Sequence, residues 1–211
     1  MKLELYWAPG ACSFVPHVGL EAAKAQFEPK MVKLHKGEHR TPAYLAMNPN
    51  GQVPVLVVDG RPLTQIVAIC DFLDRSFPQA GLLPKDPWQR SHALSQLAWM
   101  NSTPHTTATR FFFPERYAQS EAARAEVKQR ASEDFRGYLE RIQNTLVGRA
   151  DGEPFWFRDA YLFTLLRWGG YAGIDPRSLP AYHAYAQKLL QAPPVAAAVA
   201  RERISLDTYK A

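Results

Sequence analysis

The residue of this chain best suited to chemistry is a cysteine near the N-terminus, Cys12. It follows the turn Ala8–Ala11 and stands, with Ser13, just before an apolar helical pattern that includes Phe14 and Val18. At a helix N-terminus the unpaired amides and the helix dipole stabilise a thiolate and lower the pKa of a cysteine. The spacing therefore predicts a reactive thiol at Cys12. The alternative is a small buried hydrophobic side chain, which is the usual state of a free cysteine.

Other residues limit what this thiol can do. Ser13 could fill the N-cap position of the helix, and a serine N-cap is worth about 1 kcal/mol. Val15 occupies the position where a dithiol CxxC motif needs its second cysteine, so disulfide exchange of that kind is excluded. The only other cysteine, Cys70, falls on the apolar side of a predicted helix, and we expect it to pack in the core.

A second candidate for chemistry, His105, lies in the other half of the chain. It directly follows Pro104, whose missing amide should kink or break the helix that starts near Trp88. An imidazole near neutral pH can hydrogen-bond a thiolate or transfer a proton. His105 therefore has two interpretations: it lines a site, or it caps the helix break and lies on the helix surface.

The elements that would position these side chains are clearest around a proline, Pro54. Asn48–Gly51 is dense in turn-forming residues, and Gln52–Val58 is an apolar run of high β-propensity. Pro54 must lie at the beginning or edge of a strand, because proline cannot donate a ladder hydrogen bond. Asp59–Gly60 predicts a two-residue hairpin turn, and a helical pattern starts near Gln65.

The chain divides into two regions of different composition. Alternating apolar residues predict strands at 2–7 and 27–34 in the first region, whereas long helical patterns dominate the second. Residues 78–87 hold three prolines and a glycine, a density that helix and sheet both reject. We therefore expect an N-terminal α/β domain at 1–77, a linker at 78–87 and an all-helical domain at 88–211.

Two helices dominate the second region. Glu121–Leu146 predicts a long amphipathic helix that ends at Gly148 and Gly152. Residues 154–168 form the most apolar helical pattern of the chain, hydrophobic nearly all round. Such a pattern indicates a helix at the centre of a bundle.

The composition excludes several classes of protein. A length of 211 residues with 46% hydrophobic residues is ample for a globular core. No apolar run reaches the roughly 20 residues that span a bilayer, and no signal-peptide pattern opens the chain. The net charge of +5 is scattered rather than clustered, which argues against nucleic acid. With only two cysteines, we expect a soluble cytoplasmic protein that binds neither membrane nor nucleic acid, and no metal.

Three motifs in order carry a resemblance to a known family. They are YxxPGACS at 6–13, NPNGQVP at 48–54 and DAYLFTLLRW at 159–168. Together they resemble the glutathione S-transferases, in particular the bacterial beta class, over nearly the whole chain. The resemblance implies a thioredoxin-like glutathione-binding domain followed by a helical-bundle domain. The W…STxH…FxPERY arrangement resembles a beta-like subgroup in which the histidine lines the cleft opposite the cysteine, and His105 matches it.

The resemblance also assigns roles to site residues. Cys12 would face the glutathione sulfur, and Ser13 is an alternative activator of the thiol, because other transferase classes use a serine at this turn. The Val53–Pro54 bond would be cis, with the backbone of Val53 pairing the cysteinyl part of glutathione and Gln52 beside it. Lys36 would meet the glycine carboxylate.

The γ-glutamyl end of glutathione would meet Gln65 and Ile66. Gln65 retains the amide that the family uses, but Ile66 replaces a serine or asparagine and offers no side-chain hydrogen bond. Ile66 is therefore the feature that weakens the case for tight glutathione binding. Four aromatic residues are candidates for an apolar pocket for the second substrate: Trp7, Phe111, Phe112 and Phe113.

The sequence leaves three functions open. The leading one is a homodimeric transferase with glutathione as co-substrate that conjugates its thiol to small hydrophobic electrophiles, with thiol transfer or peroxide reduction as a side activity. The second, favoured by Ile66, is a non-catalytic binding or regulatory protein whose glutathione pocket has degraded. The third is a glutathione-dependent isomerase, dehalogenase or ether-cleaving enzyme, which only the substrate pocket would separate from the first.

Overall fold

The computed structural model describes residues 1–147 and 155–210. Its first part is a four-stranded sheet with strand order β2-β1-β3-β4. The strands are β1 (Leu3–Trp7), β2 (Glu28–Met31), β3 (Val55–Val58) and β4 (Arg61–Thr64). β1 and β2 are parallel, whereas β3 runs antiparallel to both β1 and β4. This mixed sheet of βαβ and ββα units is the thioredoxin-like arrangement that the sequence predicted.

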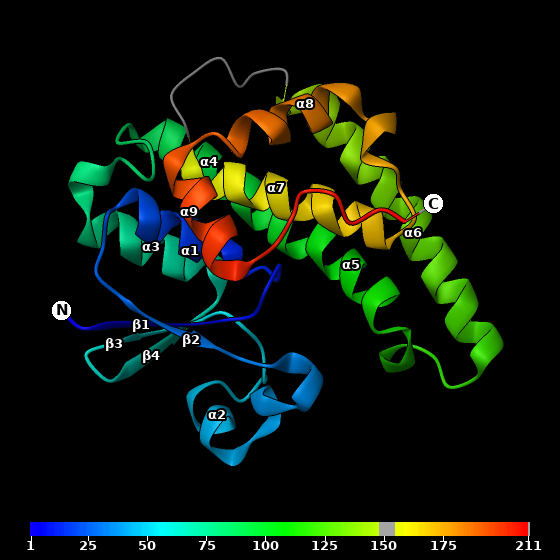
Figure 1. The fold of residues 1–211 in the computed structure, drawn as a ribbon, viewed down its shortest axis with the longest axis horizontal. Helices are drawn as coiled ribbons and strands as arrows, with labels where there is room; N and C mark the ends of the chain where they lie inside the picture. The colour runs from blue at the N-terminus through cyan, green and yellow to red at the C-terminus, as the bar shows by residue number, and fades with distance from the viewer. Residues whose placement is uncertain (148–154, 211) are drawn as a thin grey trace.

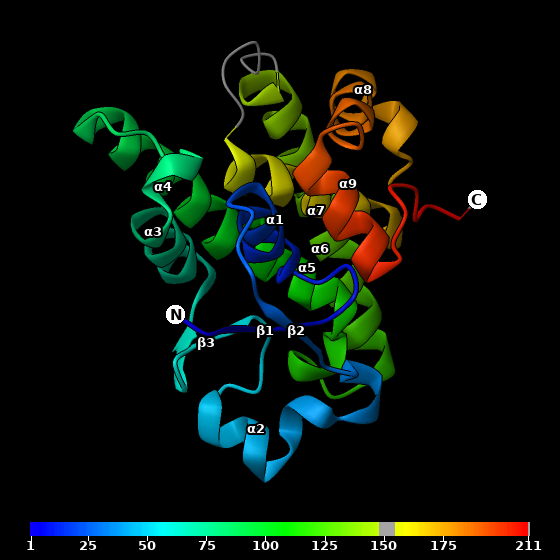
Figure 2. The ribbon, with the colours of Figure 1, turned by 60° about the vertical axis from the view of Figure 1, so that its left-hand side comes forward.

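Helices cover both faces of the sheet. α1 (Phe14–Ala22) and α3 (Ile66–Ser76) lie on one side, and the short helix α2 (Pro42–Met47) lies on the other (Figures 1 and 2). All four residues of β3 are buried, as expected for a strand covered on both faces. α1 and α3 therefore lie between the sheet and the rest of the molecule, whereas α2 lies on the opposite face of the sheet.

The predicted two-residue hairpin turn is present in the structure. Asp59 and Gly60 have φ values of 47° and 81°, and Val58 pairs with Arg61 across the turn. Two central residues with positive φ form the turn type that fits the twist of antiparallel strands. Just before β3, the Val53–Pro54 peptide bond is cis, as the resemblance implied.

The second strand is shorter than predicted. β2 covers only Glu28–Met31 of the predicted strand 27–34, and two 3₁₀ turns, Leu34–Lys36 and Glu38–Arg40, follow it. Gly37 lies between the two turns with φ of 72°, a left-handed conformation that glycine adopts without strain. This loop is therefore compact, and it reaches across the end of the sheet.

Six helices follow in the second part of the described chain. They are α4 (Pro87–Ser102), α5 (Pro104–Phe112), α6 (Glu121–Thr145), α7 (Trp156–Tyr171), α8 (Pro180–Leu189) and α9 (Pro193–Glu202). The predicted break at Pro104 is confirmed, because α4 ends at Ser102 and Pro104 opens α5. The predicted helix end at Gly148 and Gly152 lies outside the described residues.

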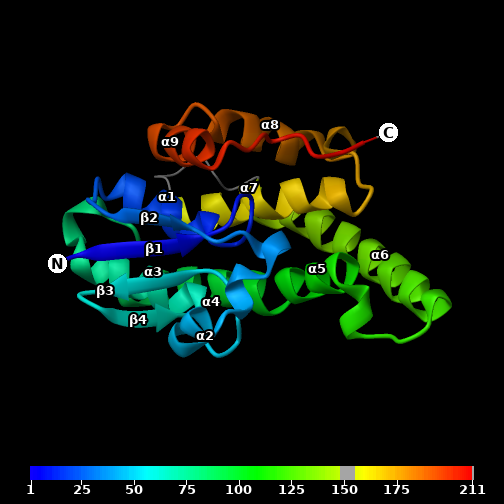
Figure 3. The ribbon, with the colours of Figure 1, turned by 60° about the horizontal axis from the view of Figure 1, so that its bottom comes forward.

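The most apolar helix is central, as its composition predicted. α7 is buried over almost its whole length, and α1 of the sheet domain packs against α7 and α9 (Figure 3). The approach at Gly19 is so close that a Cβ there would lie 2.2 Å from the Phe157 ring. Phe14 stacks on Phe163 at 5.3 Å between centroids. One continuous core thus joins α1 to the helical part, and it fixes the position of Cys12 relative to α7.

Across the described residues, none of the helices combines the length and apolar character that crossing a bilayer requires.

Candidate functional site

A cavity of about 710 Å³ lies where the sheet meets the helical domain. Its walls come from the turn before α1, the loop after β2, the Val53–Pro54 turn, the start of α3, and helices α4, α5 and α7. The cavity brings together most of the site residues predicted from the sequence: Cys12, Gln52, Val53, Pro54, Gln65, Ile66 and His105. These residues come from both parts of the chain, so the cavity forms only in the complete fold.

Cys12 lies at the cavity wall with 7% of its surface exposed. Its thiol donates a hydrogen bond to the carbonyl oxygen of Val53 at 3.3 Å. Burial raises the pKa of Cys12 to about 12, which outweighs hydrogen bonds from the amides of Cys12 and Ser13 that lower it. The prediction of a lowered pKa is therefore wrong. The helix amides act as predicted, but the sequence did not show how fully the thiol is desolvated. Cys12 is thus a neutral thiol and a hydrogen-bond donor.

Ser13 occupies the N-cap position of α1, as predicted, but its side chain is fully buried and makes no capping bond. Instead the hydroxyl oxygen accepts the amide of Ala8 at 3.1 Å, and the hydroxyl donates to the Ala8 carbonyl at 3.3 Å. A hydroxyl engaged in this way inside the protein cannot activate a thiol in the cavity. Ser13 closes the turn that presents Cys12.

His105 lines the cavity, as the first of its two interpretations predicted. Its Nδ1 lies 2.7 Å from the hydroxyl of Tyr161, which in turn donates to Oδ1 of Asn101 at 3.0 Å. The hydroxyl has one proton, so Nδ1 of His105 must be the donor to Tyr161, and Nε2 keeps its lone pair. Burial lowers the pKa of His105 to about 4. His105 is therefore a neutral hydrogen-bond acceptor near pH 7.

The Val53–Pro54 turn is held from behind by two side chains. The carbonyl of Gln52 accepts hydrogen bonds from the Tyr44 hydroxyl and the Asn48 amide, each at 2.8 Å. Tyr44 and Asn48 are only 4% exposed, so these bonds are shielded from water. The backbone of Val53 is consequently presented to the cavity in a fixed orientation.

The start of α3 forms another part of the wall. Gln65 has φ of 72°, an uncommon conformation for a residue other than glycine, and such strain gathers at functional sites. Ile66 follows as the first residue of α3, is 3% exposed and lines the cavity. The first amides of a helix have no intrahelical partner, so the backbone here can receive a carboxylate even though the Ile66 side chain cannot.

Lys36 is exposed and does not appear among the described residues that line the cavity. The same loop instead places His35 and His39 at the wall. His35 and His39 reach the wall in place of Lys36 because two 3₁₀ turns form on either side of Gly37. The sequence indicated this segment only as a polar connection. The run HKGEH at 35–39 shows two histidines in this loop, but the sequence does not show that the loop would place them at the cavity wall.

Aromatic residues form the other side of the cavity. Phe112 and Phe113 line it as predicted, together with Trp168 and Tyr171 from the end of α7. Trp7 and Phe111 are each 5% exposed and belong to the core instead. Sequence reasoning also missed Asn101 and Arg116 in the lining; both are polar residues whose positions depend on how α4 and α5 meet the sheet.

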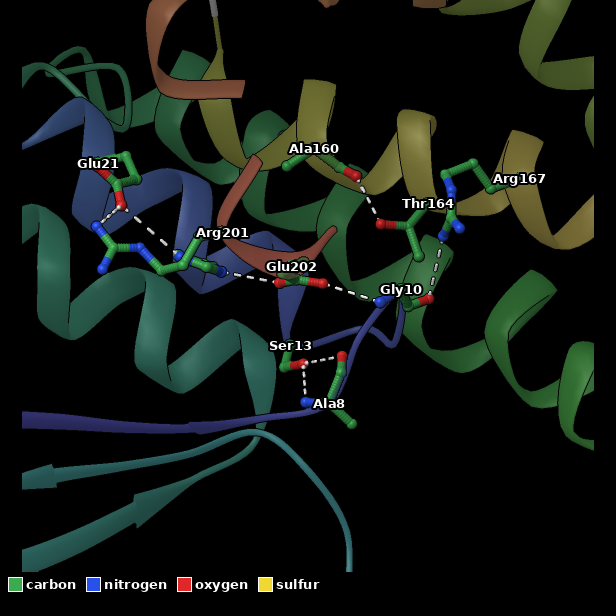
Figure 4. Close-up of polar contacts among 10 residues, drawn as sticks. Ala8, Gly10, Ser13, Glu21, Ala160, Thr164, Arg167, Arg201 and Glu202 are labelled. Atoms are coloured by element: carbon green, nitrogen blue, oxygen red, sulfur yellow. Dashed lines mark hydrogen bonds and ion pairs between the residues drawn. The ribbon is translucent and has the colours of Figure 1, made fainter. Parts of the chain in front are cut away.

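Buried hydrogen bonds of Glu202 hold the turn before Cys12 and the helix α1 that follows it (Figure 4). Glu202, at the end of α9, lies 2.8 Å from His17 Nδ1 through one carboxylate oxygen and accepts the Gly10 amide at 2.8 Å through the other. Both side chains are fully buried. On the other face of the turn, the indole of Trp168 donates to the Gly10 carbonyl at 3.0 Å. Side chains of the helical domain thus hold this turn by hydrogen bonds on two sides.

No group of three or more histidine, cysteine or acidic side chains suited to a metal ion occurs within residues 1–147 and 155–210.

The fold and the cavity together define the class of protein. A thioredoxin-like sheet presents a cis-proline turn to the N-terminus of α1, and an appended helical domain closes the same cavity. The chain therefore belongs to the class of proteins in which a thioredoxin-like domain is followed by a helical domain.

Comparison with known proteins agrees with this class. The family described as glutathione S-transferase, N-terminal domain, matches residues 1–75. The chain is 35% identical over 211 residues to glutathione S-transferase GST-4.5 of Xanthomonas campestris, covering 96% of this chain and 100% of that protein. This chain therefore belongs to the glutathione S-transferase family.

Solved structures agree. A sphingomonad glutathione S-transferase in complex with glutathione matches with a TM-score of 0.82 and 35% identity, covering 96% of this chain and 100% of that one. The beta-class enzyme of Sphingomonas chungbukensis matches with a TM-score of 0.82 and 32% identity, covering 94% and 98% of the two chains. The family and the fold predicted from the sequence are thus confirmed.

Proposed function

We propose that the protein is a glutathione transferase that conjugates the glutathione thiol to small electrophiles. The observation that carries this proposal is the single cavity that joins the Val53–Pro54 turn, the N-terminus of α1 and His105. Glutathione is present in the sphingomonad relative. We propose the same co-substrate here, and no metal takes part.

In the proposed mechanism the chain binds and orients glutathione and favours its thiolate. The backbone of Val53 pairs the cysteinyl part, which places the glutathione sulfur near the amides of Cys12 and Ser13 at the start of α1. The thiol proton leaves to solvent, and the thiolate accepts hydrogen bonds from these amides and from the neutral Cys12 thiol, which turns away from the Val53 carbonyl to donate to it. Aimed donors stabilise developing negative charge in a water-poor site. His105, neutral and with Nε2 free, can accept a hydrogen bond from the glutathione thiol before its proton leaves.

The thiolate then attacks the electrophile held against the aromatic wall of the cavity. A carbon–sulfur bond forms, and the leaving group departs with the electron pair of the bond it breaks. Catalysis in this scheme rests on proximity and electrostatics rather than on a covalent intermediate with the protein. The raised pKa of Cys12 supports conjugation over thiol transfer, because a mixed disulfide would need Cys12 as a thiolate.

The test is the pH dependence of bound glutathione. Difference absorbance in the ultraviolet follows the thiolate of glutathione on the wild type and on Cys12→Ala. The proposal predicts that the pKa of the bound thiol lies below that of free glutathione, and that Cys12→Ala raises it by roughly half a unit to one unit because one donor is lost. A bound thiol that titrates like free glutathione would contradict the mechanism.

The specific observation that favours a non-catalytic alternative is Ile66. Its buried apolar side chain lines the cavity where the resemblance implies a hydrogen-bonding residue. In that alternative the protein binds a partner and does not retain glutathione. Calorimetric titration of the wild type and of Ile66→Ser with reduced glutathione separates the two functions.

Three further predictions from the sequence stay proposals. We propose a homodimer, domain boundaries at residues 77 and 88, and a cytoplasmic location. Light scattering tests the first and limited proteolysis the second, because cleavage concentrates in exposed linkers.

A further inference from the structure

The mouth of the cavity carries positive charge without an opposing carboxylate. Its described lining includes one arginine, Arg116, and contains neither aspartate nor glutamate. Arg116 takes part in none of the ion pairs of the described residues. A guanidinium is charged at every physiological pH, so this wall of the cavity offers a cation that the protein itself does not neutralise.

Arg116 is also held in place before any ligand binds. Its guanidinium carbon lies 4.1 Å from the centroid of the Phe113 ring, a cation–π contact. The turn that carries it, Pro114–Arg116, follows α5 directly, and the hydroxyl of Tyr117 lies 2.7 Å from that of Thr109 on α5. This places the guanidinium beside the aromatic wall of the cavity. The FxPERY segment, which the proposed mechanism does not use, supplies both Arg116 and Tyr117.

The opposite lip of the mouth is close to this charge. Desolvation lowers the pKa of His39, and the neighbouring charges of Arg40 and Arg116 lower it further. His39 belongs to the loop after β2, whereas Arg116 belongs to the turn after α5 (Figure 2). His39 itself is therefore neutral near pH 7, and the positive charge that reaches the entrance comes from Arg40 on one lip and Arg116 on the other.

We propose that Arg116 selects electrophiles that carry an anionic group, with an aromatic ring bearing a carboxylate or sulfonate as the chemical class. The ring packs on Phe112, Phe113 and Tyr171, and its acidic substituent meets the guanidinium of Arg116. This inference rests on the proposed transferase function and specifies its second substrate.

One other carboxylate could use the same charge, namely the glycine end of glutathione. Arg116 lies on the helical wall beside Phe113, whereas the loop that holds Lys36 and His35 lies on the sheet side. The electrophile is therefore the better match, and kinetic constants for the two substrates distinguish the sources.

The experiment compares two electrophiles that differ only in charge, 4-chloro-3,5-dinitrobenzoate and its primary carboxamide. In each, glutathione thiolate attacks the ring carbon that carries chlorine, the carbon–sulfur bond forms, and chloride leaves. Rates are divided by the uncatalysed rate with glutathione, which removes the difference in intrinsic reactivity. The proteins are the wild type, Arg116→Gln, Arg116→Lys and the control Arg136→Gln, which removes an exposed arginine of α6.

The proposal predicts a wild-type preference for the carboxylate in normalised kcat/KM that weakens with added salt. Arg116→Gln lowers this preference roughly tenfold, Arg116→Lys lowers it less, and Arg136→Gln keeps it. An equal loss for both electrophiles would overturn the proposal, because it would show a structural role. A rise only in KM for glutathione would overturn it in favour of the glycine carboxylate.

Failure of the underlying function has a different signature. If the wild type turns over neither electrophile and gives no heat with glutathione, the transferase proposal fails and this inference with it. If glutathione binds and the carboxamide is conjugated without a preference for the carboxylate, only the role of Arg116 is refuted.

Discussion

Replacing Glu202 tests the buried hydrogen bonds that tie α9 to α1 and to the turn before Cys12. Glu202→Ala leaves two groups without their partner, His17 Nδ1 and the Gly10 amide, each 2.8 Å from the lost carboxylate. The side chains of Glu202 and His17 are fully buried, so both donors are left without an acceptor away from bulk water. Each unsatisfied buried group costs about 1–3 kcal/mol, so Glu202→Ala should cost about 2–6 kcal/mol.

The matched control lies one residue away. Arg201 pairs with Glu21 at 3.0 Å and joins the same two helices, but its side chain is 43% exposed. Exposed ion pairs contribute about 0–1 kcal/mol, so Arg201→Gln should change stability little. Glu202→Gln is intermediate, because its amide can still accept from the Gly10 amide or bond His17 but carries no charge; we expect about 1–3 kcal/mol.

The assay is thermal unfolding followed by circular dichroism. For a chain of this size each kcal/mol shifts Tm by roughly 2–4 °C, so Glu202→Ala should lower Tm by about 4–24 °C and Arg201→Gln by less than about 4 °C. Because the Gly10 turn carries Cys12, Glu202→Gln should also lower kcat/KM in a variant that remains folded. Equal Tm values for Glu202→Ala and Arg201→Gln would refute the reasoning.

Three further outcomes follow from the site. In ¹⁵N spectra of His105 the proton should lie on Nδ1, and Tyr161→Phe should move it to Nε2; an Nε2 proton in the wild type would contradict the assigned network. Cys12 should resist alkylation at pH 8, because a pKa near 12 leaves almost no thiolate, and reactivity should rise only as pH approaches that value; rapid alkylation at neutral pH would show that the thiol is not desolvated. Gly10→Ala should cost at least 1–2 kcal/mol by urea unfolding, since φ is 65° and a Cβ would lie 2.5 Å from Arg167; an unchanged midpoint would exclude this close approach.

Structural features that depend on a few adjacent residues could be predicted from the sequence. The Asp59–Gly60 hairpin and the helix break at Pro104 depend on local backbone chemistry, and both are confirmed. The cis bond before Pro54, which the resemblance implied, is also present. The apolar pattern of residues 154–168 likewise predicted a central helix, because a helix that is hydrophobic all round must be buried.

Features that depend on tertiary packing could not be predicted. The pKa of Cys12 is set by burial beneath Val53, and no local pattern reports how much water that removes. The bond from Gly10 to Glu202 joins residues 192 positions apart. The replacement of Lys36 by His35 and His39 at the cavity follows from the fold of one loop, which a polar composition leaves open.

The most direct test of the account is calorimetric titration of the wild type with reduced glutathione, beside Cys12→Ala and Ile66→Ser. The account predicts a dissociation constant between about 1 μM and a few millimolar, which corresponds to about −8 to −4 kcal/mol, with weaker binding by Cys12→Ala. No heat from the wild type, with binding recovered by Ile66→Ser, would contradict it and identify a protein whose glutathione pocket is closed at that one residue.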